Sequence, residues 1–327
     1  NDPQRGLYLL AFIAVIIAAS LSLFVSRLSL IKPSGNIKTF SKQSFISINN
    51  IFFVTLIFSV MLGVTYPLIY EYLYDQKISV GAPFYNAIFI PIVILASIFL
   101  FFSVDSKWSR SIDFRIFTKP IVLSLFFALT STFAIYFIFK TNNIAILLTI
   151  FTGLIVIIRY LIEVWTALVY KKYLNVFSAI AHFALGLLLV SISFNSLLST
   201  ERALNIKINE FEEYKDLTIY FKDIRVRKDS NYDAIKAEFN IKDKYGNNFD
   251  LSPEKRRYFT RGQITTETAI YISPLRDIYL TIGDQLEDGS WIVNVQINFL
   301  IRWIWFSACL MAFAGIVLIF SNRKSNI

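Results

Sequence analysis

Val176-Phe-Ser-Ala-Ile-Ala-His-Phe-Ala-Leu-Gly-Leu-Leu-Leu-Val190 is the stretch that decides the class of this protein, because it reads as a membrane-buried helix. About twenty such residues suffice to cross the hydrocarbon core of a bilayer. The whole chain has the same character, since 55% of its 327 residues are hydrophobic and only 17% are charged. These proportions predict a polytopic α-helical membrane protein and argue against a soluble globular domain.

Seven apolar segments of this kind recur along the chain. We expect transmembrane helices near Leu7–Val25, Asn50–Tyr70, Tyr85–Val104, Pro120–Phe139, Ile144–Leu161, Asn175–Leu197 and Phe299–Phe320. Four alternate connections hold the membrane-flanking cations Arg27, Lys32, Lys38, Lys42; Lys107, Arg110, Arg115, Lys119; Lys171, Lys172; and Arg323, Lys324. The positive-inside rule places these connections and the C-terminus in the cytoplasm. The net charge of +9 is therefore explained by the orientation of the chain in the membrane, and we expect no nucleic-acid partner.

A long polar segment separates the sixth and seventh spans. Ile235, Ala237, Phe239 and Ile241 alternate with polar residues, which is the two-residue period of a half-buried strand. Turn-forming pairs such as Ser252-Pro253, Ser273-Pro274 and Asp288-Gly289 divide the segment. We predict an inserted periplasmic antiparallel β-domain of six or so strands. The domains are then a six-helix membrane region at 1–198, the β-domain at 199–298, and a last helix with a cytoplasmic tail at 299–327.

His182 is the only histidine of the chain, and it lies within the apolar stretch quoted above. An ionisable ring at membrane depth suggests function, and neutral imidazole is a common axial ligand of haem iron. The alternative is a histidine that hydrogen-bonds across a helix interface, a contact that contributes about 1 kcal/mol. Gly186 follows one helical turn later on the same face, where it lets a flat macrocycle or another backbone come close.

No motif of a soluble enzyme occurs in the sequence, because it has neither a glycine-rich nucleotide loop nor an HExxH zinc motif. A non-catalytic membrane scaffold, or a subunit of a haem or solute exporter, is the competing reading. Against a transporter, polar groups are scarce within the spans and no paired helix interruptions occur in corresponding halves.

Several strings resemble the C-terminal half of the CcmF/NrfE family of cytochrome c-type biogenesis proteins, and they follow the order found in that family. They are Phe45-Ile-Ser-Ile-Asn-Asn50, Leu62-Gly-Val-Thr-Tyr-Pro67, Lys77-Ile-Ser-Val-Gly-Ala-Pro-Phe-Tyr-Asn86, Ala181-His182, Pro253-Glu-Lys-Arg-Arg-Tyr258, Thr265-Thr-Glu-Thr-Ala-Ile270, Arg276-Asp-Ile-Tyr-Leu280, Asp288-Gly-Ser-Trp291 and Arg302-Trp-Ile-Trp305. The resemblance runs essentially from end to end.

This resemblance implies a haem lyase subunit of the bacterial inner membrane, which helps attach haem to the CxxCH motif of apocytochrome c on the periplasmic side. Haem is then a substrate brought by the chaperone CcmE, and His182 is an axial ligand of a resident haem b. Quinol would be the reductant, and CcmH/CcmI-type subunits would be partners. The family's tryptophan-rich segment and its other histidines belong to an N-terminal half that this chain lacks. We therefore expect this half, as a cut or split piece, to be inactive alone and to need that N-terminal half as a partner.

A basic cluster in the β-domain is the second candidate site. It comprises Lys255, Arg256, Arg257 and Arg261. The cluster would dock the acidic surface of a partner subunit, or haem propionates. The alternative for any one of these residues is a cation that is merely solvated.

Overall fold

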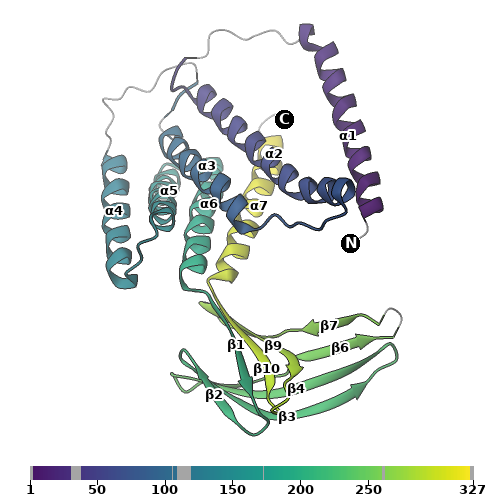
Figure 1. Cartoon of the computed structure of the whole chain (residues 1–327). Helices are drawn as coiled ribbons and strands as arrows, with labels where there is room; N and C mark the ends of the chain where they lie inside the picture. Colours follow the sequence, from purple (N-terminus) through teal and green to yellow (C-terminus); the bar gives the residue numbers. More distant parts are fainter. Residues whose placement is uncertain are drawn as a thin grey trace. The chain divides into compact units, whose positions relative to one another are not determined.

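The computed structural model describes residues 3–30, 38–104, 106–108, 119–171, 173–259 and 262–324. It divides into two units, Asn1–Ile162 and Glu163–Ile327. The first unit contains helices α1 to α4 and most of α5 (Figure 1). The second contains the end of α5, then α6, the β-domain and α7. Of the cations used to predict the orientation, Lys32, Arg110, Arg115 and Lys172 lie outside the described residues.

Seven helices in the described part of the chain are long and apolar enough to cross a membrane. They are α1 (Pro3–Ser26), α2 (Lys42–Tyr74), α3 (Ala82–Ser103), α4 (Lys119–Phe139), α5 (Ile144–Val169), α6 (Tyr173–Leu198) and α7 (Ile301–Lys324). A short 3₁₀ turn, η1, follows α1 at Leu28–Leu30. The predicted fold class, a polytopic membrane protein with an inserted β-domain, is confirmed.

Helix α2 is longer than the apolar pattern predicts. It begins at Lys42 rather than near Asn50 and covers 33 residues. The Ser41 hydroxyl accepts a hydrogen bond from the Ser44 backbone N–H at 3.3 Å, so a capped polar turn precedes the apolar run. Asp75 closes the other end in a left-handed conformation, and its N–H donates to the Glu71 carbonyl. Caps of this kind add turns that a hydropathy window does not detect.

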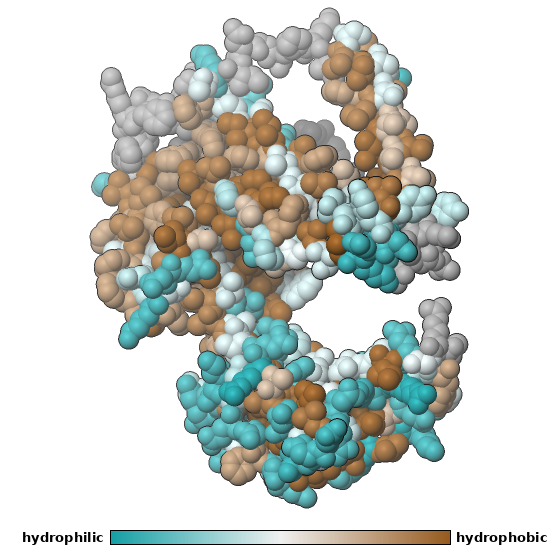
Figure 2. Space-filling view, in the orientation of Figure 1, coloured by the Kyte–Doolittle hydropathy of each residue, from teal (hydrophilic) through white to brown (hydrophobic). Residues whose placement is uncertain are grey.

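The helices of the first unit pack through a small apolar cluster and one close approach at a glycine. Phe101 of α3, Ile121 and Ala128 of α4, and Ile155 of α5 form a buried apolar cluster. On α2, a Cβ at Gly63 would lie 2.6 Å from the Tyr85 hydroxyl of α3, so an added side chain would force Tyr85 or the helices to shift. Many other apolar side chains on the helices are exposed, and Figure 2 shows brown, apolar residues over much of the visible helix surface. Such a surface is suited to lipid.

The described residues of the β-domain form ten antiparallel strands in two sheets. Their bounds are β1 (Thr200–Ile206), β2 (Phe211–Tyr214), β3 (Leu217–Lys228), β4 (Tyr232–Asp243), β5 (Asn248–Leu251), β6 (Glu254–Tyr258), β7 (Ile264–Glu267), β8 (Ala269–Ile272), β9 (Arg276–Gln285) and β10 (Trp291–Phe299). The smaller sheet has the order β1-β10-β9-β8, and the larger has the order β2-β3-β4-β6-β7 with β5 paired to β4. The expectation of six or so strands was too low, because β2, β5, β7 and β8 have four residues each and are too short to display alternation.

The two sheets enclose one apolar core. Phe221 of β3 and Phe239 of β4 are both fully buried, and their rings stack with centroids 4.4 Å apart. From the smaller sheet, Val293 and Val295 of β10 are buried in the same core. Turns close the strands where the sequence predicted them, with Gly289 at a φ of 82° between β9 and β10. Only a residue that tolerates positive φ fits there, which favours glycine.

Candidate functional site

His182 lies near the middle of α6 and is half-buried. Gly186, one turn later, is buried, as is Ala184. Residues four apart stack on one face of a helix, so the face that carries the imidazole has no Cβ at its next position. The sequence predicted this juxtaposition, and the helical geometry of α6 brings the two residues together on one face.

The residues around His182 bear on what kind of metal group it could hold. Among the described residues, no three His, Cys, Asp or Glu side chains gather where they could hold a metal ion. An ion that needs several protein ligands is therefore not matched by these residues. The porphyrin supplies the equatorial ligands of haem iron, so the protein needs to supply only axial ones. A single imidazole on an apolar helix with a glycine beside it fits that requirement.

The end of α6 is tied to the end of β10. The Asn195 side-chain amide donates to the Phe299 carbonyl at 2.7 Å, and the Phe299 N–H donates to the Ser199 hydroxyl at 3.1 Å. The chain thus enters and leaves the β-domain at adjacent points. Strand β1 begins at Thr200, only one residue after α6 ends. The helix that carries His182 is consequently joined to the domain without a flexible linker.

The first turn of α7 is tied to the turn between β8 and β9. Arg302 Nε lies 3.2 Å from the carboxylate of Asp277, whose side chain is 7% exposed. The Trp303 indole N–H donates to the Pro274 carbonyl at 2.9 Å. The Leu300 N–H donates to the Leu275 carbonyl, also at 2.9 Å. Both membrane helices of the second unit are therefore fixed to the β-domain by hydrogen bonds as well as by the chain.

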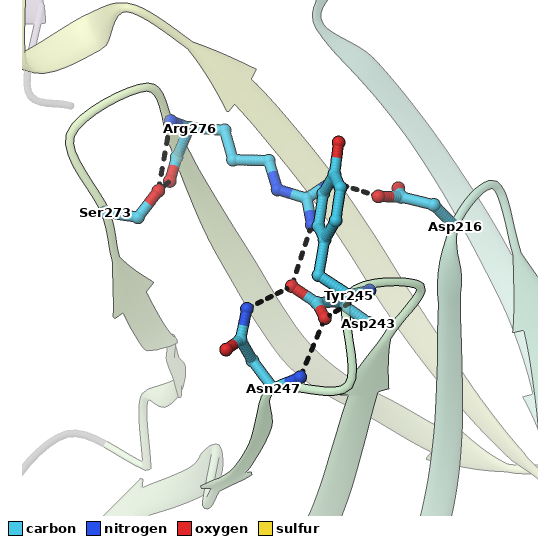
Figure 3. A network of polar contacts seen from close by, with 6 residues as sticks. All are labelled: Asp216, Asp243, Tyr245, Asn247, Ser273 and Arg276. Carbon is cyan, nitrogen blue, oxygen red and sulfur yellow. Dashed lines mark hydrogen bonds and ion pairs between the residues drawn. The ribbon is translucent and has the colours of Figure 1, made fainter.

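Arg276, at the start of β9, joins the two sheets (Figure 3). Its guanidinium lies 2.6 Å from the Asp216 carboxylate and 3.5 Å from that of Asp243. Asp243 also accepts hydrogen bonds from the Asn247 side chain and from the backbone N–H groups of Asn247 and Tyr245, each at 2.9 Å. These contacts lower the pKa of Asp243, the Asn247 side-chain amide most of all and Arg276 least. The network fixes the membrane-proximal end of the sandwich.

The predicted basic cluster is divided between the two faces of β6. Arg256 pairs with Glu254 at 2.9 Å and stacks over the Tyr232 ring at 4.9 Å. Lys255 is on the opposite face and pairs with Asp284 of the smaller sheet. Arg257 is exposed, and no described residue forms an ion pair with it. Arg261, the fourth predicted member, lies outside the described residues. The alternation of a strand separates residues that looked like one cluster in the sequence.

A cavity of about 340 Å³ lies beside Lys255 and Arg257, between the two sheets. Residues of both sheets line it, among them Asp233, Ile235, Asp284 and Trp291. The Trp291 side chain is buried, and its indole nitrogen has no hydrogen-bond partner among the described residues. Sequence reasoning missed this feature, because Trp291 opens an alternating strand and reads as an ordinary core residue. The adjacent acid Asp284 gave no signal either.

Comparison with known proteins assigns the β-domain first. Residues 197–298 match the family model described as the CcmF C-terminal beta-sandwich. Over 99% of its length, the chain is 29% identical to the cytochrome c-type biogenesis protein CcmF of Haemophilus influenzae and 26% identical to that of Escherichia coli. It is 23% identical over the same share to the NrfE protein of Haemophilus influenzae. The chain spans about half the length of these curated relatives, namely 51%, 50% and 51%.

A solved structure, titled Cytochrome c Heme Lyase CcmF, has the same fold over 94% of this chain and 49% of its own length. The TM-score is 0.73, and the sequence identity is 16%. The shared fold includes the membrane helices as well as the sandwich, because the match extends far beyond the β-domain. In sequence and in fold, the chain is therefore similar to the C-terminal half of the CcmF and NrfE cytochrome c-type biogenesis proteins.

Proposed function

We propose that this chain is the C-terminal part of a haem lyase subunit in cytochrome c maturation, and that it holds a haem b through His182. The observation that carries the proposal is the single histidine on the apolar helix α6, with Gly186 on the same face. The similarity to CcmF proteins supports the same process. Such a protein would promote covalent attachment by holding its resident haem close to a second, substrate haem.

The residues of this chain would bind and shield the group. His182 would bind the haem iron, and the apolar side chains of α6 would keep water from the imidazole. Further ligation would come from the N-terminal half that the relatives carry. A bound haem supplies a one-electron redox centre there, for which quinol is the proposed reductant.

The β-domain would receive the reaction partners on the periplasmic side. The cations between the helices support this orientation. An odd number of predicted membrane crossings separates Lys38, Lys42 and Lys107 from the domain along the chain. The partners would be apocytochrome c, the haem chaperone CcmE and CcmH/CcmI-type subunits. Lys255, Arg256 and Arg257 would contact an acidic partner surface or haem propionates. A domain fixed to α6 and α7 keeps its orientation toward them.

The test is the haem content of the protein. The chain is expressed together with its N-terminal half, and haem per protein is measured by pyridine haemochrome in the wild type and in His182→Ala. We expect stoichiometric b-type haem in the wild type and loss of most of it in the variant, because an axial ligand is removed. The matched control is Leu185→Ala, which truncates another half-buried side chain of α6 and should leave haem bound.

Full haem occupancy in His182→Ala, at unchanged protein level, would contradict the ligand assignment and leave His182 a packing residue. A colourless wild-type protein would contradict the haem lyase proposal itself and favour a scaffold or a solute exporter.

A further inference from the structure

The inward face of the larger sheet changes character along β4 and β6. Ile235 packs against the apolar core, and its register partner on β6 is Lys255. Two residues away along the strands, Asp233 and Arg257 are likewise opposite each other in the register. Opposite residues in a ladder share a face, and so do residues two apart, so Lys255 and Arg257 continue the inward face. Inward positions of a sandwich are normally apolar, and here two cations adjoin a cavity of about 340 Å³.

The two inward cations beside this cavity differ in their ion pairs. Lys255 already pairs with Asp284 of the other sheet. Arg257 forms no ion pair with any described residue, although Asp233 lies opposite it. The exposed guanidinium of Arg257 is thus open to an added anion, and a carboxylate matches its planar donor fork.

The other residues that line the cavity indicate what kind of molecule could carry such a carboxylate. Val226, Ile235 and Ile264 supply apolar surface to the cavity. Ile264 opens β7, which is the edge strand of the larger sheet and hydrogen-bonds within that sheet only to β6 among the described strands. An edge strand offers main-chain groups to an added strand, while pockets beside it select alternate side chains. An extended peptide therefore fits the site better than a compact molecule.

The cavity adjoins the end of β10 that is farther along the strand from α7. Strand β10 begins at Trp291 and reaches Phe299 just before α7 starts. At about 3.4 Å per residue, the strand from Trp291 to Phe299 is roughly 27 Å long.

We propose that the inter-sheet cavity of the β-domain binds an acidic side chain on an extended segment of a partner protein, with Arg257 as its principal counter-ion. This inference rests on the proposed contact between β6 and an anionic partner. It does not depend on haem at His182. Asp233, opposite Arg257, opposes the incoming carboxylate and so limits the affinity.

The experiment uses two fluorescent hexapeptides that differ at one position, a central glutamate flanked by valines or its glutamine counterpart. Each is titrated by anisotropy against the detergent-solubilised full chain. We expect the glutamate peptide to bind about ten-fold more tightly, because a hydrogen-bonded charge pair is formed. Arg257→Gln should abolish this preference, and Asp233→Asn should increase it. Lys242→Gln, which changes an exposed lysine of β4 outside the cavity, should leave it unchanged.

Equal binding of the two peptides, or no binding of either, overturns the inference. Binding to phosphatidylglycerol vesicles that falls in Arg257→Gln, with no preference between the peptides, overturns it in favour of a lipid surface. The haem proposal fails by a different result, namely haem retained in His182→Ala, and that outcome leaves the peptide preference untouched. The two proposals are therefore tested separately.

Discussion

At the scale of single residues, the β-domain places charge where it can be compensated. Asp243 is buried, yet four donors approach it: three from its own turn and the guanidinium of Arg276, which also pairs with Asp216. Taking a carboxylate out of water is unfavourable unless such donors satisfy it. The cost is offset here because the donors come from a tight turn that is already ordered.

We expect the stability of the β-domain to fall in acid through Asp243. The pKa of this group is lowered in the folded state, so its stabilising contribution is complete above the unfolded value of about 3.9 and is lost as pH falls below it. Asp243→Asn should therefore flatten the decline of the unfolding free energy below about pH 4. Urea titrations at several pH values, read by pulsed hydrogen exchange of the β3 and β4 amides, measure this decline.

The control is Glu287→Gln, which changes an exposed acid of the β9–β10 turn. An unchanged acid slope in Asp243→Asn would assign the pH dependence to other carboxylates of the domain.

At the scale of elements, one glycine determines how closely two helices approach. Gly63 of α2 faces Tyr85 of α3 so closely that an added Cβ would meet the tyrosine hydroxyl at 2.6 Å and the ring carbons at 2.9 and 3.0 Å. Small residues at helix interfaces allow packing that compensates for the absence of a hydrophobic driving force in lipid.

Gly63→Ala should lower the melting temperature of the solubilised chain, with a cost of about 1–3 kcal/mol for overpacking. In a Tyr85→Ala background the same substitution should be neutral, because the clashing ring is gone. Size-exclusion chromatography of heated samples measures both. Gly315→Ala on α7 is the control, since an added Cβ there meets nothing within 4 Å. An equal loss in the two backgrounds would refute the role of Tyr85.

At the scale of the second unit, α6, the β-domain and α7 are held as one body by side-chain contacts at its junctions. The double variant Asn195→Ala with Trp303→Phe removes one hydrogen bond at each junction. We expect faster hydrogen exchange in residues 273–277 and 299–303, with unchanged exchange in the β3–β4 core, because local opening is released without global unfolding. Faster exchange throughout the domain would instead make these contacts part of its folding core.

The sequence was sufficient for the parts of the fold that have a long, regular period. The seven spans are long, so hydropathy located them, and β4 and β10 alternate over enough residues to be recognised. The four-residue strands have no room for a period, and the α2 cap lies outside any apolar window. The pairing of Arg302 with Asp277 joins residues 25 positions apart through a turn, which no local pattern encodes. His182 was a candidate because it is unique, whereas Trp291 became visible only through its unpaired nitrogen.

The junction at Ser199 and Phe299 has a consequence for how such a protein can change. A hundred residues leave and return to the membrane at two points joined by a 3.1 Å hydrogen bond, so the helices on either side need only a short connection. The sandwich is therefore an exchangeable cassette: a tight turn in its place would keep α6 and α7 as a hairpin. Domains of other specificity could be exchanged at this point without moving the histidine-bearing helix.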